Sequence, residues 1–461
     1  MIKTYRQAKK YIKSFIPKID KKSIKGSVYF NKFSRFIKSF NNPHNAFPSI
    51  HIAGTSGKGS TTYLISKILK SAGYKTGLHL SPHLISIRER AQINNTNISQ
   101  YKFTKIVNKM KSIINKAKST YFKTLSFIPI MQVLSFLYFK QEKIDIAVVE
   151  TAVGGIYDGT NTINSNIAVI TPIDFDHTSV LGKTLKEIAE KKAGIIKKHQ
   201  IAVISAKQRQ SVEQVLKTTS NRLKVNFYED EKDFKVKIKK MTTRGVLFDY
   251  FEKDKKITNV FCSLVGSHQA RNSALAIKTA LELKKIGYKI KNSHIKKALS
   301  DSLYHGRFEI IKVGDKTIIL DGAHNQHKFT ALVDTLSKIY PKHKFICVFS
   351  CKKSKAMQKS VEILNKKMRS VIVTQFIQPT DNLQRMQRDP IETFIIVNKL
   401  KKIKFKGKIA EIPSLKKALI LSLIEAEKND KILITGSLHT VAEAKKLLLN
   451  KGFIKKIEAL H

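Results

Sequence analysis

Residues 49–62 read Ser-Ile-His-Ile-Ala-Gly-Thr-Ser-Gly-Lys-Gly-Ser-Thr-Thr, and no other stretch of the 461-residue chain says more about its fold. A short β-type segment runs into a glycine-rich loop, and a lysine followed by hydroxyl residues opens a helix. Glycines let backbone N–H groups close around phosphate oxygens, the start of a helix adds positive potential, and a lysine neutralises negative charge. The stretch therefore predicts a polyphosphate-binding turn between a strand and a helix.

The spacing of this loop departs from the standard P-loop. That pattern needs a glycine five positions before Gly57 and Ser or Thr directly after Lys58, but Ile52 and Gly59 occupy those places and the hydroxyl comes at Ser60. A plain Gly/Ser turn is the alternative, and we favour a variant P-loop. The residues expected to contact the phosphates are Gly54, Thr55, Ser56, Gly57, Lys58, Gly59 and Ser60.

Length and hydropathy place the chain among globular proteins of two to three domains. Hydrophobic residues make up 42% of the chain, and no apolar run approaches the roughly 18 residues that span a bilayer. The lysine-rich start, residues 1–20, has a helical period but lacks the apolar core of a signal peptide. We expect a cytoplasmic protein, monomeric, without a membrane partner.

The formal net charge of +52 raises the question of nucleic-acid binding. Lysine and arginine are spread along the whole chain, lysine predominates, and no regular aromatic spacing accompanies them. We therefore expect no specific nucleic-acid partner, although the charge favours anionic substrates. The three cysteines, Cys262, Cys347 and Cys351, cannot form a disulfide framework. Cys347 and Cys351 lack partners at zinc-ligand spacing and are expected to be buried hydrophobic residues.

Strands and helices alternate from the glycine loop onward, which indicates a doubly wound α/β fold with a mostly parallel sheet. Strands are expected at 76–79, 144–149, 167–171 and 201–205, and helices at 61–72, 103–118, 130–139 and 184–191. Residues 225–264 predict a small antiparallel β element, followed by an amphipathic helix at 269–285. A second α/β series begins near residue 308, with strands at 317–320, 344–349, 370–374 and 431–435. We place an ATP-binding domain at 1–300 and a smaller C-terminal domain at 301–461.

Further polar residues follow the predicted strands, where open α/β sheets bind ligands. Ser81, in Ser-Pro-His-Leu, follows one strand; its hydroxyl suits a cation, and a simple turn is the alternative. Glu150 ends a buried strand before Gly154 and Gly155, as a Mg²⁺ ligand near a phosphate does, and a turn cap is the alternative. His177, after Asp176, is either a site residue or a core histidine. In the second series, Arg307 and Asp321 with His324 suggest a nucleotide contact.

The order of these motifs resembles that of the folylpolyglutamate synthase/dihydrofolate synthase family, within the Mur ligase superfamily. The resembling blocks are 54–60, 81–84, 88–90, 150–161, 176–182, 189–195, 266–272, 306–309, 321–325 and 436–438. The resemblance implies an N-terminal P-loop ATPase domain and a C-terminal Rossmann-like glutamate ligase domain. It implies an ATP-dependent ligase that activates a folate carboxylate as an acyl phosphate and joins it to L-glutamate, with Mg²⁺.

The resemblance also assigns roles to individual residues. Lys58, His177 and Lys192 would be catalytic, and Lys192 matches a lysine that is carbamylated in the family. Ser60, Ser81, Glu150 and His177 would hold Mg²⁺. Asn272, Arg307, Asp321 and His324 would contact the nucleotide. Ile156, Tyr157, Asp158 and Ser437 would contact the substrate.

The sequence departs from the family mainly on the pterin side. Ile128 stands where a glutamate follows phenylalanine in the family, and Ile156-Tyr157 replaces Arg-Leu before Asp158. Ala152 replaces glycine after Glu150 and Thr151, Gln326-His327 follows Asn325, and residues 350–356 are basic. These departures favour polyglutamate extension over dihydrofolate synthesis. A Mur-type ligase for another carboxylate, and a P-loop nucleotide-binding protein without ligase activity, remain alternatives.

Overall fold

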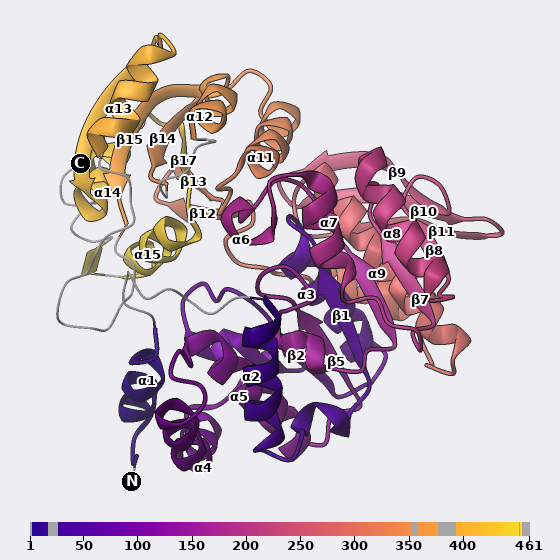
Figure 1. The fold of residues 1–461 in the computed structure, drawn as a ribbon. Coiled ribbons are helices and arrows are strands. Elements are labelled where there is room, and N and C mark those ends of the chain that lie inside the picture. The colour runs from indigo at the N-terminus through magenta and orange to yellow at the C-terminus, as the bar shows by residue number, and fades with distance from the viewer. Residues whose placement is uncertain (1, 17–25, 352–356, 377–392, 451, 454–461) are drawn as a thin grey trace. The chain divides into compact units, whose positions relative to one another are not determined.

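The computed structural model describes residues 2–16, 26–351, 357–376, 393–450 and 452–453, which form two compact units. The first unit spans residues 1–239, 247–263 and 268–302, and the second spans 240–246, 264–267 and 303–461. In Figure 1 the ribbon of the first unit runs from indigo to pink, and that of the second runs mainly from orange to yellow.

The first unit is built on an eight-stranded sheet with the order β4-β3-β2-β5-β1-β6-β7-β8. Its strands are β1 (Ser49–Ala53), β2 (Thr76–His79), β3 (Ala91–Ile93), β4 (Thr96–Asn97), β5 (Ile146–Glu150), β6 (Ile167–Ile170), β7 (Ala202–Ser205) and β8 (Phe227–Glu229). The strands from β2 to β8 in this order are parallel, and β3 and β4 extend one edge in antiparallel fashion. The central strands β1, β5 and β6 are mainly apolar and buried along their whole length, as a sheet covered on both faces requires.

Helices cover this sheet (Figure 1). They are α1 (Tyr5–Lys13), α2 (Gly26–Lys38), α3 (Lys58–Ser71), α4 (Gln100–Ser119), α5 (Phe127–Gln141), α6 (Thr178–Leu181), α7 (Leu185–Ala193), α8 (Gln210–Arg222), α9 (Ser267–Lys285) and α10 (Asn292–Ser300), with short 3₁₀ turns at Pro43–Ala46, Ile87–Arg90 and Gly159–Thr162. Ala147 and Val149 of β5 pack into a core with α4 and α5. Val148, between them, points to the opposite face because strand side chains alternate.

The register of the parallel strands aligns their carboxyl ends. Ile52 of β1 lies opposite Glu150 of β5, and Val149 lies opposite His79 of β2. Ala53 lies opposite Ile170 of β6. The segments that follow β1, β2, β5 and β6 therefore leave the sheet at one edge, which is where ligands bind in open α/β sheets.

A three-stranded antiparallel element is present as predicted, but it is shorter than residues 225–264. It contains β9 (Phe234–Thr242), β10 (Gly245–Glu252) and β11 (Lys255–Cys262), in the order β11-β10-β9. Residues 227–229 instead form β8, which pairs in parallel with β7 and extends the large sheet. The sequence did not separate these strands because both kinds are short and β-branched or aromatic.

The second unit has a six-stranded sheet with the order β12-β13-β17-β14-β15-β16. Its elements are β12 (Glu309–Val313), β13 (Lys316–Leu320), α11 (Gln326–Ile339), β14 (Phe345–Phe349), α12 (Met357–Asn365), β15 (Met368–Gln375), α13 (Thr393–Lys402), β16 (Lys408–Ser414), α14 (Leu415–Ile424), β17 (Lys431–Thr435) and α15 (Leu438–Leu448). In this sheet β12 and β13 pair in antiparallel fashion, and the other neighbouring strands are parallel. The predicted fold class is confirmed, while β12 and β16 had been missed.

The described residues bear on two expectations from the sequence, one about membrane-spanning segments and one about the cysteines. None of their helices combines the length and apolar character needed to cross a bilayer. Cys347 and Cys351 are buried, as predicted, and Cys262 is buried too. Burial raises the pKa of Cys351 to about 12, so this thiol stays protonated.

Candidate active site

The glycine loop lies between β1 and α3, at the carboxyl edge of the large sheet. Gly57 precedes α3 with a φ of 85°, and the first helical hydrogen bond runs from the N–H of Thr61 to the carbonyl of Gly57 at 2.9 Å. The N–H groups of Lys58, Gly59 and Ser60 therefore belong to the first turn, where a helix has no internal acceptors for its donors. This arrangement, with its positive end of the helix dipole, suits an anion.

Two lysines converge on the carbonyl oxygen of Gly54. Lys58 donates to it from within the loop at 3.1 Å, and Lys192 donates to it from α7 at 2.6 Å. Lys192 is buried, with an exposed fraction of 3%. Two of the three residues expected to be catalytic, Lys58 and Lys192, thus lie together at the start of the glycine loop.

The first part of the loop is held by the segment after β6. The N–H groups of Thr55 and Ser56 donate to the carbonyl of Pro172, at 2.9 and 3.2 Å. The hydroxyl of Thr55 donates to the carbonyl of Asp174 at 3.0 Å. These backbone donors are therefore engaged within the protein, whereas the buried hydroxyl of Ser56 has no hydrogen-bond partner among the described residues. A phosphate oxygen would satisfy that hydroxyl.

Asn272, a predicted nucleotide contact, lies directly against the loop. A Cβ atom placed on Gly57 would come within 2.5 Å of the Asn272 Oδ1 atom. The Asn272 amide is oriented because it donates to Gln269 at 2.9 Å. Both residues lie on the buried face of α9, so the structure places this helix next to the glycine loop.

Ser81 and Glu150 meet at the ends of β2 and β5. The N–H of Ser81 donates to Glu150 Oε2 at 2.9 Å, and the carboxylate of Glu150 is buried. Carboxylate and hydroxyl oxygens are ligands that suit Mg²⁺, so these two residues fit the predicted metal role. Ser60 is buried in the first turn of α3.

Arg90 is a buried residue of this region to which the sequence reasoning had assigned no role. Its guanidinium donates to the Ser81 hydroxyl at 3.1 Å and to His83 Nδ1 at 3.0 Å, and it lies 5.2 Å from the Phe127 ring centroid. Burial lowers the pKa of Arg90 to about 10, although Glu150 and Glu89 counteract this effect. The only sequence signal was its place in the Arg-Glu-Arg block at 88–90.

His177 is not a core histidine and does not end a strand. β6 ends at Ile170, and His177 follows in the loop that precedes α6, with a φ of 48° and an exposed side chain. Its backbone N–H donates to the carboxylate of Asp176 at 2.9 Å. Its predicted metal role stays a prediction. Among the described residues, no three His, Cys, Asp or Glu side chains form a metal-binding group.

Asp158 organises the loop after β5. One of its carboxylate oxygens accepts the N–H groups of Ala152 and Val153, each at 2.9 Å. The other accepts the N–H and hydroxyl of Thr160 and the amide of Gln132, at 2.9, 2.6 and 3.0 Å. Both oxygens of this buried carboxylate thus accept hydrogen bonds from other groups of the protein. The predicted contact between Asp158 and the substrate stays a prediction.

Gly155 in this loop and Gly194 at the end of α7 allow the loop and the helix to approach closely. A Cβ atom on Gly155 would lie 2.7 Å from the carbonyl oxygens of both Lys191 and Lys192, and one on Gly194 would lie 2.3 Å from Ile156 Cβ. Ile156 also donates its N–H to Lys191 at 2.8 Å. The Lys191 ammonium lies 5.5 Å from the centroid of Tyr157. Ile156 and Tyr157, two predicted substrate contacts, therefore lie beside the helix that carries Lys192.

In the second unit, Arg307, Asp321 and His324 form one cluster. Asp321 accepts the N–H groups of Phe308 and Ala323, at 2.9 and 2.8 Å. Burial raises the pKa of Asp321, and Arg307 counteracts this effect. His324 Nδ1 lies 3.0 Å from the carbonyl of Gly322, and its Nε2 lies 3.1 Å from Lys328 Nζ.

Ser437, the last predicted substrate contact, caps α15. Its hydroxyl accepts the N–H of His439 at 3.1 Å. Leu438, the first residue of α15, packs so closely on Gly322 that a Cβ there would lie 2.3 Å from Leu438 Cδ2. The start of α15 is therefore adjacent to the Arg307 cluster.

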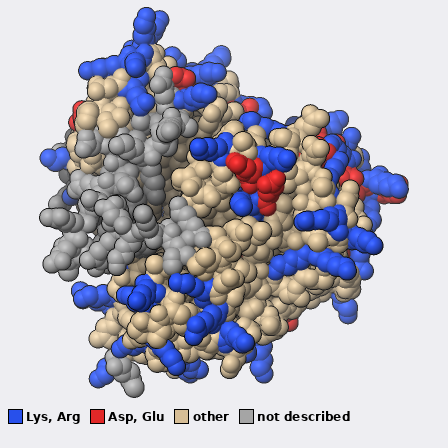
Figure 2. Space-filling view, in the orientation of Figure 1, with Lys and Arg blue, Asp and Glu red and all other residues tan. Residues whose placement is uncertain are grey.

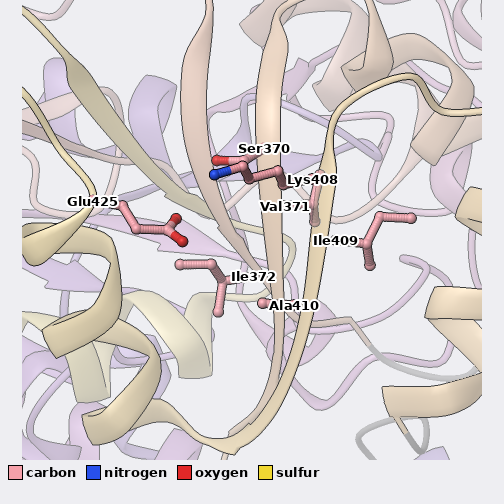
Figure 3. A pocket seen from close by; sticks show the side chains of 7 residues that line it. All are labelled: Ser370, Val371, Ile372, Lys408, Ile409, Ala410 and Glu425. Atoms are coloured by element: carbon pink, nitrogen blue, oxygen red, sulfur yellow. The ribbon is translucent and has the colours of Figure 1, made fainter.

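Two pockets lie away from these residues. One of about 370 Å³ is lined by strands β15 and β16 and by Glu425 (Figure 3). The other, of about 730 Å³, is lined by residues 44–48 and by Thr162, Asn164 and Asn166, at the amino ends of β1 and β6. On the face shown in Figure 2, lysine and arginine side chains are dispersed rather than gathered into one patch.

Comparison with known proteins agrees with this geometry. Residues 52–280 match the Mur ligase middle domain, and residues 306–438 match the Mur ligase glutamate ligase domain. The chain is 30% identical over 421 residues to the dihydrofolate synthase/folylpolyglutamate synthase of Bacillus subtilis, covering 90% of this chain and 94% of that protein.

Solved structures show the same similarity. The folylpolyglutamate synthase of Thermotoga maritima superposes with a TM-score of 0.80 at 27% identity, covering 98% of both chains. The fold is also that of the Mycobacterium tuberculosis folylpolyglutamate synthase solved with ADP, with a TM-score of 0.86, 24% identity, and coverage of 97% of this chain and 98% of that one. The chain therefore belongs to the dihydrofolate synthase/folylpolyglutamate synthase family of Mur ligases.

Proposed function

We propose that the protein is an ATP-dependent ligase that adds L-glutamate to the terminal glutamate carboxylate of a reduced folate. The observation that supports this best is the first turn of α3, whose N–H groups at Lys58, Gly59 and Ser60 have no helical acceptors. This turn follows β1, which pairs with the strand that ends at Glu150. In this proposal residues 1–300 form the ATP-binding domain and residues 301–461 form the glutamate ligase domain.

The glycine loop suits ATP because its donors are already oriented. Lys58 would neutralise charge on the terminal phosphates, and the N–H groups of Lys58, Gly59 and Ser60 would donate to their oxygens. Gly54, Thr55, Ser56 and Gly57 shape the loop, and Asn272 lies against it. Arg307, Asp321 and His324 are proposed as further nucleotide contacts.

Glu150 and Ser81 would hold Mg²⁺, with Ser60 and His177 as further proposed ligands. The buried carboxylate of Glu150 beside the Ser81 N–H supplies the oxygen ligands that this ion prefers. Bound Mg²⁺ would neutralise the charge that accumulates on the transferring phosphoryl group.

The chemistry follows from the poor reactivity of a carboxylate, whose leaving group would be oxide. The folate carboxylate attacks the γ-phosphorus of ATP, the bond to ADP breaks, and an acyl phosphate forms. The glutamate amine then attacks the acyl carbon, phosphate leaves, and the amine loses a proton. The protein contributes positioning and charge neutralisation, as phosphoryl transfer requires. Lys192, in its carbamylated form, would offer anionic oxygens in place of its ammonium.

Substrate contacts are proposed at Ile156, Tyr157, Asp158 and Ser437. Synthesis of dihydrofolate from dihydropteroate is a second candidate activity, because the similar protein of B. subtilis carries both names. We also propose a cytoplasmic monomer without a specific nucleic-acid partner.

The test is ADP release with L-glutamate and either tetrahydrofolate, dihydropteroate or no pterin. The proposal expects turnover with tetrahydrofolate that depends on glutamate. Turnover with dihydropteroate would establish the second activity. ADP release that neither pterin changes would contradict a folate ligase and favour a nucleotide-hydrolysing protein or a ligase for another carboxylate.

A further inference from the structure

The turn that presents Arg307 is held in a strained conformation. It connects to β12 through Gly306, with a φ of 72°, and Phe308, with a φ of 46°. A bulky residue such as phenylalanine rarely adopts a positive φ, which persists only where the surrounding contacts impose it. The Phe308 side chain is buried in the core of the second unit, and its N–H donates to Asp321 at 2.9 Å.

Glu309 fixes the other side of this turn. Its Oε2 atom accepts the N–H of Gly306 at 3.0 Å, and its Oε1 atom lies 2.5 Å from the ammonium of Lys445. His305 Nδ1 lies between the two charged groups, 3.0 Å from Glu309 Oε1 and 2.6 Å from Lys445 Nζ. Burial raises the pKa of Glu309, but hydrogen bonds from His305, Lys445 and the Gly306 N–H outweigh it and lower that pKa to about 2.

The ion pair between Glu309 and Lys445 is buried, with side-chain exposures of 12% and 6%. A buried ion pair contributes little net stability, because desolvation offsets the attraction between the charges. The two charged groups must nevertheless stay in contact, so the pair fixes the relative positions of the segments that carry Glu309 and Lys445. Here it ties the last turn of α15 to the turn that carries Arg307.

Arg307 lies inside this framework. Its Nη1 atom donates to the carbonyl of Gly306 at 3.1 Å, and its guanidinium lies 5.7 Å from the ring centroid of Tyr304. A Cβ atom on Gly322 would come within 2.9 Å of Nη1, so the glycine leaves room for the guanidinium. A displacement of Gly306 would therefore displace Arg307.

We propose that Glu309 and Lys445, with His305, are positioning residues that fix the Gly306–Phe308 turn and thereby aim Arg307 at its anionic ligand. This inference rests on the proposed function, in which Arg307 contacts the nucleotide. It gives α15 a positioning role through Lys445, in addition to the substrate contact proposed for Ser437 at the start of this helix.

A double-mutant cycle between Lys445→Met and Arg307→Ala tests the proposal, with kcat and KM for ATP measured by ADP release. Lys445→Met alone should lower kcat/KM for ATP about 10- to 100-fold, as a small misplacement of a positioning group does. In the Arg307→Ala background the same change should have almost no further effect, because both changes remove one function. The matched control is Lys446→Met, at the neighbouring lysine of α15, which should retain wild-type values.

Additive effects of the two changes would overturn the positioning role, since a general loss of structure lowers activity in either background. If Lys445→Met does not fold, Glu309→Gln combined with Lys445→Met removes both charges and replaces it in the cycle. An unchanged kcat/KM in Arg307→Ala would overturn the nucleotide contact and the positioning role together. Failure of the wild-type protein to ligate glutamate would instead overturn the proposed function.

Discussion

The ammonium of Lys192 lies 2.6 Å from the carbonyl oxygen of Gly54, although 138 positions separate the two residues in the chain. This contact joins α7 to the first residue of the glycine loop. Because the carbonyl of Gly54 also accepts from Lys58 at 3.1 Å, the two ammonium groups share one acceptor. A change at either lysine should therefore affect the geometry of the loop.

Replacement of Lys58 by alanine should abolish most ligase turnover. The side chain is the charged donor nearest the proposed phosphates, and loss of one such donor costs roughly 100- to 1,000-fold in kcat. ADP release with tetrahydrofolate and glutamate measures this effect. Lys70→Ala, at an exposed position in the last turn of the same helix, is the control. Near-normal turnover in Lys58→Ala would contradict the assignment of the loop.

Lys192→Gln should lower kcat more than tenfold, since it removes both the contact with Gly54 and the amine that a carbamate requires. Carbon-13 NMR of the wild-type protein in labelled bicarbonate should show a carbamate signal that the variant lacks. Lys186→Gln, at an exposed position of α7, should keep both the activity and the signal. Wild-type protein without the signal would exclude the modification while leaving the activity comparison intact.

Gly57→Ala should weaken ATP binding more than it destabilises the fold. A residue with a Cβ at φ 85° costs about 1–2 kcal/mol, and the methyl group would also collide with Asn272 Oδ1 at 2.5 Å. Gly73→Ala isolates the first effect, because Gly73 has a φ of 93° and no atom of the described residues lies within 4 Å of the place its methyl group would take. Titration calorimetry with ADP and thermal unfolding compare the two variants. Equal ADP affinity in both would show that the approach to Asn272 is unimportant.

Acid should destabilise the first unit through its buried histidines. Burial and the nearby Arg90 lower the pKa of His79 to about 3, and burial lowers the pKa of His51 well below its usual 6.5. Between pH 6.5 and the folded-state pKa, each histidine binds a proton only when unfolded. In this range the free energy of unfolding should therefore fall by about 1.4 kcal/mol, for each histidine, with every unit by which the pH is lowered.

The pH effect is measured by urea unfolding of the wild type and His79→Asn at pH 7, 6 and 5. The slope of unfolding free energy against pH should be smaller in the variant, because one such proton uptake is removed. Other titrating groups cancel in this difference. His343→Asn, at an exposed position of the second unit, is the control for a histidine-to-asparagine change outside the first unit. An unaltered slope in His79→Asn would contradict a neutral, buried His79.

Some site residues could be located from the sequence because their position follows from local rules. Ser81 and Glu150 were each expected at the end of a strand, and the structure joins them by a 2.9 Å hydrogen bond. The strand pattern was sufficient to place each residue at a strand end, while the sheet order decided that these two strands are neighbours. His177 was placed less well: it lies seven residues beyond the last residue of β6, and its exposure depends on the path of a loop.

Arg90 and Lys445 show the opposite case. Both are cations that the structure buries. In a chain with 86 lysines and arginines, the sequence marked Arg90 only through its place in the Arg-Glu-Arg block at 88–90, and it did not mark Lys445. Their importance comes from what they contact: Ser81 for Arg90, and Glu309 for Lys445. A buried cation needs such partners, and only packing decides which side chains become buried.

The sequence alone determined that a strand, a glycine loop and a helix form an anion-binding turn, because glycine conformations and helix ends obey local stereochemistry. It also determined the two α/β series, through the alternation of apolar segments. The tertiary structure decided which groups meet at that turn. Lys192 reaches Gly54, and Asn272 reaches Gly57, because α7 and α9 pack beside the loop, and such packing depends on the shape of the whole core rather than on any single segment.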